Sequence, residues 1–426
     1  MDTGRKTAFE ILLEIETSAA YSNLSINKFI QRNAPPDPAF VRELVYGVLE
    51  NRLLLDYYLD KLIASGISRT GRRERTLLRL GLYQLIGMES VPEYAAVNET
   101  VALARRLCRG REGFINGVLR GFIKKRDNLA LPPEGTDEYL SVRYSFPLWL
   151  VRMWKAQYGS RLLPQLLAAS NERAPLTIRP NSMRTDARRL SELLTREGFV
   201  VSACSQAENI LAVSGSGLLA SESYAGGLFS VQDEGSYLAC TALAPRAGET
   251  IIDVCAAPGG KTCALAELMG DEGRIIACDI YQHRLDLIEQ QAGRLGLGII
   301  STRLLDGTRG DDALFGTADR VLADVPCSGL GVIRRKPEIK YKEPDREAYE
   351  ALLKTQSRLL QTAASYLKPQ GTLVYSTCTI NKEENDFQIQ KFVEKNREYE
   401  IIEERQFFPT EGIDGFYICK LKQKGN

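Results

Sequence analysis

One stretch, Ile251 to Thr262, constrains the fold of this chain more than any other. Its sequence is IIDVCAAPGGKT, an apolar run with an Asp, then small residues, a Pro and two glycines, and the amphipathic run ALAELM follows it closely. This order predicts a strand that turns sharply into a helix. Gly259 and Gly260 would let a ligand approach the backbone, and the positive end of the helix dipole attracts a carboxylate or a phosphate. We therefore expect a strand-to-helix turn that holds a cofactor.

Spacing excludes two common nucleotide-binding loops. A phosphate-binding P-loop needs a glycine five residues before its Gly-Lys pair, where this chain has Cys255. The dinucleotide fingerprint GxGxxG is also absent from this turn. The prediction that remains is the first strand and turn of a doubly wound α/β sheet that binds a nucleoside-containing cofactor.

The composition of the chain excludes several classes of protein and of catalytic mechanism. The chain has 426 residues, enough for two or three domains, and its formal net charge of +1 favours local charged patches over a global field. Nine cysteines without an apolar leader fit a reducing cytoplasm better than a disulfide framework, and no apolar run is long enough to cross a membrane. The single histidine, His283, excludes mechanisms that need two histidines, and without a close C-x-x-C pair we expect no metal.

Residues 1–134 are predicted to form an all-α bundle. Apolar residues recur at helical spacing, as at Ala8, Leu12 and Ile15, and no strand alternation interrupts them. Between Arg105 and Arg126 there are eight Arg or Lys residues and one acid, Glu112. A solvated helical surface and a stripe that binds phosphates both fit this composition. The Pro/Gly stretch LPPEG at 131–135 predicts the first domain boundary.

Residues 135–228 are predicted to form a small α/β module. LTIRPN and ILAVSGSG are strand candidates, and RRLSELLTREG between them is a helix candidate. Such a small sheet could bind single-stranded RNA, or its aromatic neighbours could simply be packing. LFSVQDEGS, at 228–236, closes the module and leads by a helix into the strand at Ile251.

Residues 229–426 are predicted to form a parallel sheet with helices on both sides. GRIIACDI, TRLLDG, RVLADVPCSG and GTLVYSTC each place an apolar run before a polar or cysteine-bearing end, and helical patterns separate them. Ligands of such sheets bind at the carboxyl ends of the strands. The residues at those ends are Asp279, Asp306, Asp324, Cys327 and Cys378.

The order of these motifs resembles a known family. DVCAAPGGKT, CDI, DVPCSGLG, RRKPEIKY and YSTCTI follow one another as in the RNA 5-methylcytosine methyltransferases, and YAAVNE and FINGVLR resemble the NusB family of RNA-binding proteins. The whole chain is thus similar to the ribosomal RNA small subunit methyltransferase B family. One departure is Thr379, which stands where Ser is commoner in that family.

The resemblance implies a cofactor and its ligands. The cofactor would be S-adenosylmethionine, with Asp279 on the ribose hydroxyls and Asp306 near the adenine, and Asp324 would also be among the residues that bind it. The loop residues that would hold it are Cys255, Ala256, Ala257, Pro258, Gly259, Gly260 and Lys261.

The resemblance also implies catalytic roles for two cysteines. C5 of cytosine is too weak a nucleophile to attack a sulfonium methyl group, so a thiolate must first add to C6. Cys378, in the Thr-Cys motif, would be this nucleophile, and Cys327, in the Pro-Cys motif, would release the product; in DNA cytosine methyltransferases the Pro-Cys cysteine is the nucleophile. Asp324 could hold a proton near N3 of the base. The thiols of Cys240, Cys255, Cys263 and Cys278 are expected to be structural.

We therefore expect an enzyme that methylates C5 of a cytidine in small-subunit (16S) ribosomal RNA. Its partner would be that RNA, with no membrane or metal, and the chain would act as a monomer. The basic segments at 105–126 and 334–342, the latter with five Lys or Arg and one Glu, would contact phosphates. The alternative is a non-catalytic RNA-binding or antitermination-like protein with a remnant methyltransferase domain.

Overall fold

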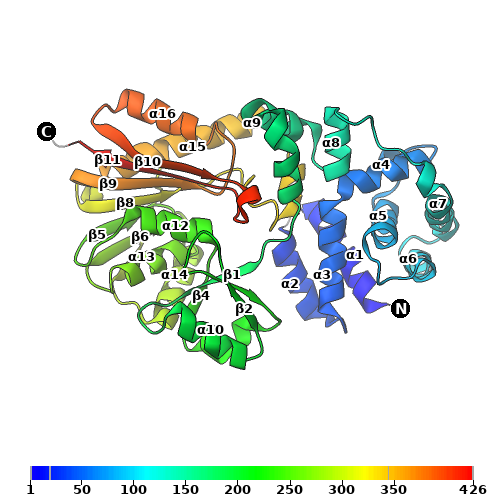
Figure 1. Ribbon diagram of the computed structural model, residues 1–426, viewed down its shortest axis with the longest axis horizontal. Coiled ribbons are helices and arrows are strands. Elements are labelled where there is room, and N and C mark those ends of the chain that lie inside the picture. The colour runs from blue at the N-terminus through cyan, green and yellow to red at the C-terminus, as the bar shows by residue number, and fades with distance from the viewer. Residues whose placement is uncertain (1, 19–20, 344, 425–426) are drawn as a thin grey trace. The chain divides into compact units, whose positions relative to one another are not determined.

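The computed structural model describes residues 2–18, 21–343 and 345–424, which form two compact units (Figure 1). We call them the helical unit, Met1–Glu172 with Ile333–Glu343, and the sheet unit, Arg173–Val332 with Pro344–Asn426. Among the described residues, no helix is both long enough and apolar enough to span a membrane.

The helical unit is all-α, as predicted. Ala8, Leu12 and Ile15 lie on one buried face of its first helix, and α3 begins at Pro38 after Asp37, whose carboxylate accepts a hydrogen bond from the Phe40 N–H at 2.9 Å. The helices are α1 (Thr3–Ser18), α2 (Ser22–Asn33), α3 (Pro38–Glu50), α4 (Arg52–Leu62), α5 (Arg72–Gly87), α6 (Glu93–Leu107), α7 (Glu112–Lys125), α8 (Asp137–Tyr144) and α9 (Leu148–Ala169), with the short 3₁₀ turns η1 (Ile67–Arg69), η2 (Arg126–Asn128) and η5 (Pro337–Tyr341).

The helical unit continues beyond the Pro/Gly stretch at 131–135. That stretch has no regular structure, but α8 and α9 on its far side pack with the bundle. The Leu53 N–H, for example, donates to Ser145 Oγ at 2.8 Å. The packing thus groups residues 135–172 with the bundle. The division of the chain into functional segments 1–134, 135–228 and 229–426 stays a prediction.

A four-stranded antiparallel sheet begins the sheet unit. Its strands are β1 (Leu176–Pro180), β2 (Val200–Ala203), β3 (Leu211–Ser214) and β4 (Phe229–Val231), in the order β2-β3-β1-β4. The helices α10 (Ala187–Arg196) and α11 (Glu222–Ala225) and the 3₁₀ turn η3 (Leu218–Ala220) accompany it. The strand candidates LTIRPN and ILAVSGSG are confirmed as β1 and β3.

The larger sheet has seven strands in the order β10-β11-β9-β8-β5-β6-β7. The five from β9 to β7 are parallel, as predicted, and β11 runs antiparallel to both of its neighbours, β9 and β10, so the sheet is mixed at this edge. The strands are β5 (Thr250–Asp253), β6 (Arg274–Asp279), β7 (Ile300–Leu304), β8 (Ala318–Asp324), β9 (Leu367–Thr377), β10 (Tyr399–Phe407) and β11 (Phe416–Gln423).

Helices cover both faces of this sheet, which confirms the doubly wound architecture (Figure 1). Ile251 and Val374 pack toward α12 (Glu234–Leu243), α13 (Gly260–Leu268) and α14 (Gln282–Leu295), while the next residues, Ile252 and Tyr375, pack toward α15 (Arg346–Ser365) and α16 (Asp386–Lys395). This alternation follows from the two-residue period of a strand. The 3₁₀ turns η4 (Asp312–Leu314) and η6 (Pro409–Glu411) complete the unit.

Candidate active site

The turn after β5 has the predicted strand-to-helix form. Ala256 N–H donates to the Cys278 carbonyl at 2.9 Å, which joins the loop to β6. Gly259 has φ of +102°, and a Cβ there would lie 3.1 Å from Ile288 Cα, so only glycine fits this position without strain. At Gly260 the nearest atom to an added Cβ is Gln232 Nε2 at 3.9 Å, so the backbone there is accessible.

Below this loop, Asp253 is a fully buried carboxyl group at the end of β5. Thr262 Oγ1 donates to its Oδ2 at 2.7 Å, which ties the strand end to the first turn of α13. Burial raises the pKa of Asp253 to about 7. This residue therefore supports the loop from beneath.

Asp279 and Asp306 lie at adjacent strand ends. Asp279 is the last residue of β6, and its carbonyl accepts a hydrogen bond from the Leu305 N–H at 3.0 Å, one residue before Asp306. Asp279 Oδ1 accepts from the Tyr281 N–H at 3.1 Å. Hydrogen bonds from Thr308 lower the pKa of Asp306, which keeps that carboxylate charged.

Asp324 at the end of β8 is held from two sides. Lys261 Nζ donates to its Oδ2 at 2.7 Å, and Ser376 Oγ donates to its Oδ1 at 2.8 Å. Although burial acts to lower it, Asp324 and Asp233 raise the pKa of Lys261 above its usual value, so this ammonium stays charged. The ion pair joins the predicted cofactor loop to the predicted catalytic carboxylate.

The two predicted catalytic cysteines lie side by side. Cys327 Sγ and Cys378 Sγ are 3.2 Å apart, although 51 positions separate them in the chain. The residues that follow them also meet, because Ser328 Oγ and Thr379 Oγ1 are 2.9 Å apart. The hydrogen bond to Cys378 and burial raise the pKa of Cys327 well above its usual value, so Cys327 keeps its proton near neutral pH.

The sequence prediction missed Glu384, which supports the loop that carries Cys327. Glu384 is fully buried, and its Oε2 accepts hydrogen bonds from the Ser328 N–H at 2.8 Å and from Gln356 Nε2 at 3.0 Å. Asn381 Nδ2 donates to Oε1 at 3.1 Å. The segment NKEEND contains three acids and reads as a polar loop, so no sequence signal singled out this glutamate.

Four other cysteines near the predicted cofactor loop and its strands differ from one another in how far they are buried. Cys240, Cys263 and Cys278 are buried, and burial raises the pKa of each thiol to about 12. Cys255 is half-buried in the predicted cofactor loop, and burial raises the pKa of its thiol as well. All four thiols thus stay protonated and unreactive near neutral pH, as expected of structural cysteines.

These residues fit a nucleoside-containing cofactor with a charged amino-acid part. Asp279 accepts a hydrogen bond from the Tyr281 N–H and pairs with Arg284 at 3.9 Å, and its carboxylate keeps acceptor capacity for ribose hydroxyls. The first N–H groups of α13 have no partner within the helix and follow an accessible glycine, as a bound carboxylate requires.

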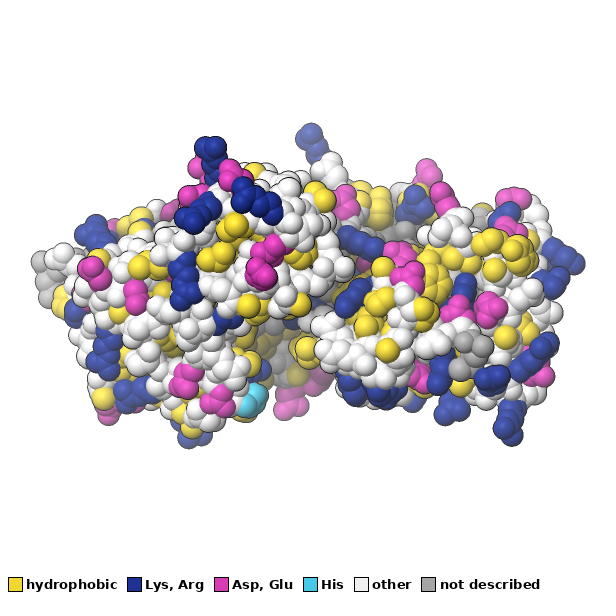
Figure 2. Space-filling model, turned by 90° about the horizontal axis from the view of Figure 1, so that it is seen from below, with side chains coloured by type: hydrophobic (Ala, Val, Ile, Leu, Met, Phe, Trp, Pro, Cys, Tyr) yellow, Lys and Arg dark blue, Asp and Glu magenta, His cyan; other side chains and the backbone are white. Residues whose placement is uncertain are grey.

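The first basic segment lies on the surface of the helical unit. All eight Arg and Lys residues between Arg105 and Arg126 are exposed, on α6, α7 and the turns beside them. Among them, Arg126 pairs with Glu93 and Arg111 with Glu74. On the face drawn in Figure 2, dark blue basic side chains and magenta acidic ones are interspersed, as the small net charge predicts.

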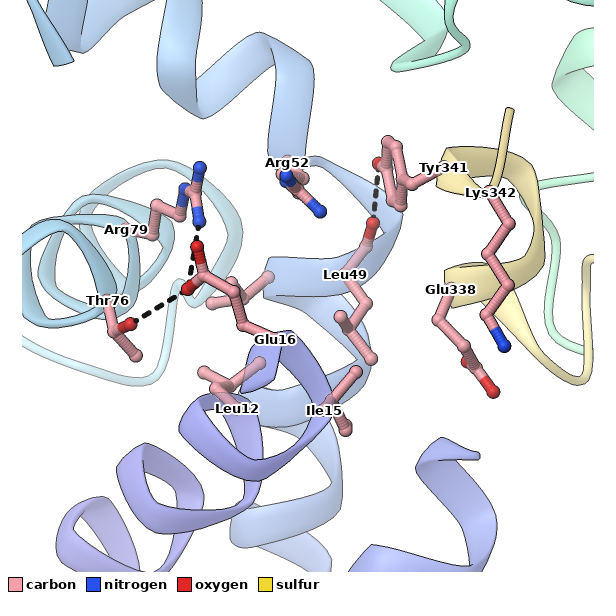
Figure 3. A pocket seen from close by; sticks show the side chains of 11 residues that line it. Leu12, Ile15, Glu16, Leu49, Arg52, Thr76, Arg79, Glu338, Tyr341 and Lys342 are labelled. Atoms are coloured by element: carbon pink, nitrogen blue, oxygen red, sulfur yellow. Dashed lines mark hydrogen bonds and ion pairs between the residues drawn. The ribbon is translucent and has the colours of Figure 1, made fainter. Parts of the chain in front are cut away.

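The prediction that the second basic segment, residues 334–342, contacts phosphates was wrong for Lys340. It is fully buried in the helical unit, where its ammonium donates to the Glu50 carbonyl and to Asn171 Oδ1, both at 2.9 Å. Its neighbour Tyr341 donates to the Leu49 carbonyl at 2.6 Å and lines a cavity of about 190 Å³ (Figure 3). We call residues 333–343 the strap.

Comparisons with known proteins agree with this organisation. The family model described as "16S rRNA methyltransferase RsmB/F" matches residues 240–422, the NusB family model matches residues 2–124, and a ferredoxin-like domain model of RsmF/B-like methyltransferases matches residues 146–217.

Full-length relatives and a solved structure are also similar. A probable ribosomal RNA small subunit methyltransferase B from Bacillus subtilis is 36% identical over 99% of each chain, and one from Vibrio cholerae is 35% identical over 92% of this chain and 91% of that protein. The crystal structure of PH0851 has the same fold, with a TM-score of 0.84 and 22% identity over 99% of each chain. The chain therefore belongs to the RsmB/F family of S-adenosylmethionine-dependent 16S rRNA methyltransferases.

Proposed function

We propose that this protein methylates C5 of a cytidine in 16S ribosomal RNA through a covalent bond between a cysteine and C6. The observation that carries the proposal is the pair Cys327 and Cys378, whose sulfurs lie 3.2 Å apart. Asp324, three residues before Cys327, is hydrogen-bonded to Ser376, two residues before Cys378. A methyltransferase that acts on a nitrogen or oxygen nucleophile has no need of two adjacent thiols at strand ends. Carbon C5 of cytosine does, since it becomes nucleophilic only after a thiolate adds to C6.

The reaction divides into steps that this chain's residues can perform. The Cys378 thiolate adds to C6, the C5–C6 double bond opens, and the enamine that results is nucleophilic at C5. S-adenosylmethionine, when bound, would supply the methyl group that C5 takes up and would leave as S-adenosylhomocysteine. A base then removes the C5 proton, the bond between Cys378 and C6 breaks, and the double bond is restored.

The roles of the two cysteines follow from their motifs. Cys378, in the Thr-Cys motif, is the thiol assigned to attack, and Cys327, in the Pro-Cys motif, is the one assigned to product release, as the resemblance to the RNA methyltransferases implies. Each oxygen of Asp324 already accepts one hydrogen bond and retains a second lone pair, with which Asp324 would contact the base near N3.

The cofactor contacts follow the same reasoning. The loop from Cys255 to Lys261 would hold the amino-acid part of S-adenosylmethionine, Asp279 the ribose hydroxyls, and Asp306 the adenine edge. The exposed basic residues of α6 and α7 would bind phosphates of the RNA, with the protein acting as a monomer in the cytoplasm.

Methyl transfer tests this proposal. The purified chain, S-adenosylmethionine with a labelled methyl group and 16S ribosomal RNA should yield labelled 5-methylcytidine on nucleoside analysis. Label found in another nucleoside would contradict the cytosine-C5 assignment. RNA binding without any methyl transfer would instead favour the non-catalytic alternative.

A further inference from the structure

A buried arginine of the small sheet reaches the cofactor loop. Arg179 lies on β1 with only 2% of its surface exposed, yet its guanidinium contacts α13 at two places. Nη1 donates to the Gly260 carbonyl at 3.1 Å, and Nη2 and Nε donate to the two carboxylate oxygens of Glu267 at 2.7 and 3.2 Å. Nη1 also donates to Gln232, which precedes α12.

This arrangement is not explained by stability alone. Removing a guanidinium and a carboxylate from water costs several kcal/mol, so apolar residues of similar volume often stabilise a fold as well as a buried ion pair does. What an apolar pair cannot supply is a donor to the Gly260 carbonyl. The planar fork of arginine can bond Glu267 and this carbonyl together, whereas an ammonium acts as a point donor.

The orientation of the Gly260 carbonyl affects the neighbouring N–H group of the loop. This carbonyl shares one rigid peptide plane with the Lys261 N–H, so fixing the carbonyl also fixes the direction of that N–H. The Lys261 N–H belongs to the first turn of α13, whose N–H groups have no acceptor within the helix and are available to an anionic ligand. The same residue carries the ammonium bound to Asp324.

We propose that Arg179 is a positioning residue that orients the cofactor loop through the Gly260 carbonyl. The proposal rests on the assignment of residues 255–261 as the S-adenosylmethionine loop. It gives the small sheet a role in cofactor binding, besides any contact that the sheet makes with RNA.

The chain offers a matched control in Asn181, which follows β1 and is fully buried. Its Nδ2 donates to the Gly227 carbonyl at 2.9 Å and to the Leu295 carbonyl at the end of α14 at 3.0 Å. Asn181 thus joins the same small sheet to the neighbouring helix without touching the cofactor loop. Loss of these two hydrogen bonds should lower the stability of the fold without changing the conformation of the cofactor loop.

The test compares two variants with the wild-type full-length chain. Arg179→Met/Glu267→Leu replaces the ion pair by apolar residues, and Asn181→Ala removes the control anchor. Calorimetric titration with S-adenosylmethionine should give a Kd raised about tenfold in the double variant, the effect of removing one hydrogen bond at the ligand-binding backbone. Asn181→Ala should lower the melting temperature and keep the wild-type Kd.

A second measurement needs no ligand. Hydrogen exchange of the Cys263 amide, which donates to the Gly259 carbonyl at 2.9 Å and closes the first turn of α13, should be faster in the cofactor-free double variant than in Asn181→Ala. If the double variant does not fold, Arg179→Lys replaces it, because an ammonium held by Glu267 would no longer fix the Gly260 carbonyl. The Kd of that variant should rise as well.

Three outcomes separate the alternatives. A folded Arg179 variant with the wild-type Kd would overturn the positioning role. Equal weakening in Asn181→Ala would also overturn it, since the effect would then follow stability alone. A wild-type chain that binds no S-adenosylmethionine would refute the proposed function itself.

Discussion

Lys340 is a lysine that the fold removes entirely from water. Its ammonium lies 4.4 Å from the centre of the Phe146 ring and donates to two neutral oxygens, with no carboxylate at bonding distance in the part of the chain that the structure describes. Burial lowers the pKa of Lys340 to about 7, and the nearby Glu50 carboxylate acts in the opposite direction. This lysine anchors the strap at the cost of a buried charge.

The pH dependence of stability follows from that shift. The folded-state pKa is about 7 and the unfolded value is 10.5, so between these pH values the unfolded chain binds more protons than the folded one. The free energy of unfolding should therefore rise with pH across this window, by at most about 1.4 kcal/mol per pH unit. Below pH 7 the penalty of the buried ammonium is fully present.

Denaturant unfolding of Lys340→Met checks this prediction. The difference in unfolding free energy, wild type minus Lys340→Met, should increase between pH 7 and pH 10. Lys342→Met is the control, because Lys342 is exposed, and its difference from the wild type should stay flat. Parallel pH profiles for the wild type and Lys340→Met would show that Lys340 titrates normally.

At this scale, the sequence located residues whose place follows from strand order. Asp279, Asp324, Cys327 and Cys378 end or follow parallel strands, so a single rule brings them to one edge of the sheet. Glu384 and Arg179 could not be found in that way. Each acts through a contact set by packing between segments distant in sequence, as with Arg179 and Gly260, 81 positions apart.

At the scale of elements, the strands at one edge of the larger sheet escaped prediction. β10 reads YEIIEERQF, and its run of glutamates looks like a solvated surface because this edge strand is exposed along most of its length. The parallel strands β5, β6, β8 and β9 were predicted because most of their residues are buried and they read as apolar runs. β2 was missed for the same reason as β10, since all four of its residues are exposed or half-exposed.

The basic helices α6 and α7 carry the prediction for RNA binding. Replacing Arg105, Arg109, Lys124 and Lys125 by Gln should weaken binding of 16S ribosomal RNA and flatten its salt dependence. The log–log slope should fall by about 0.7 to 0.9 for each phosphate that the variant no longer neutralises. Cofactor affinity should not change. Binding titrations at several salt concentrations measure both slope and affinity.

A control variant distinguishes a specific surface from total charge. Lys354, Arg358, Lys391 and Lys395 are equally exposed on α15 and α16, and their replacement by Gln removes the same charge. The salt slope of this variant should match the wild type. Equal salt slopes for the two variants would show that the basic residues of α6 and α7 form an ordinary solvated surface and not a phosphate-binding one.

At the scale of the whole molecule, the packing of the strap is the feature that could not be predicted from the sequence. Residues 333–343 follow Val332 directly and lie between the two cysteine motifs, yet they pack within the helical unit. The Ser22 N–H, for example, donates to Glu338 Oε1 at 2.9 Å across 316 positions. The RRKPEIKY motif thus has a packing role, which its charge composition could not predict.

The chain as a whole combines a helical unit and a methyltransferase sheet, which the order of motifs predicted. The seven-stranded sheet, the cofactor turn and the paired cysteines all fall within the sheet unit. For this site we propose that Cys378 attacks the base and that Cys327 is needed for its release.

Adduct trapping with Cys378→Ala and Cys327→Ala tests that claim most directly. Each variant is incubated with 16S ribosomal RNA and S-adenosylmethionine, and protein–RNA adducts are measured by denaturing electrophoresis. Cys327→Ala should accumulate a methylated adduct, because the attack on C6 proceeds while release fails. Cys378→Ala and the double variant should form no adduct and transfer no methyl group. An adduct that accumulates in Cys378→Ala and not in Cys327→Ala would contradict the account, because it would make Cys327 the nucleophile.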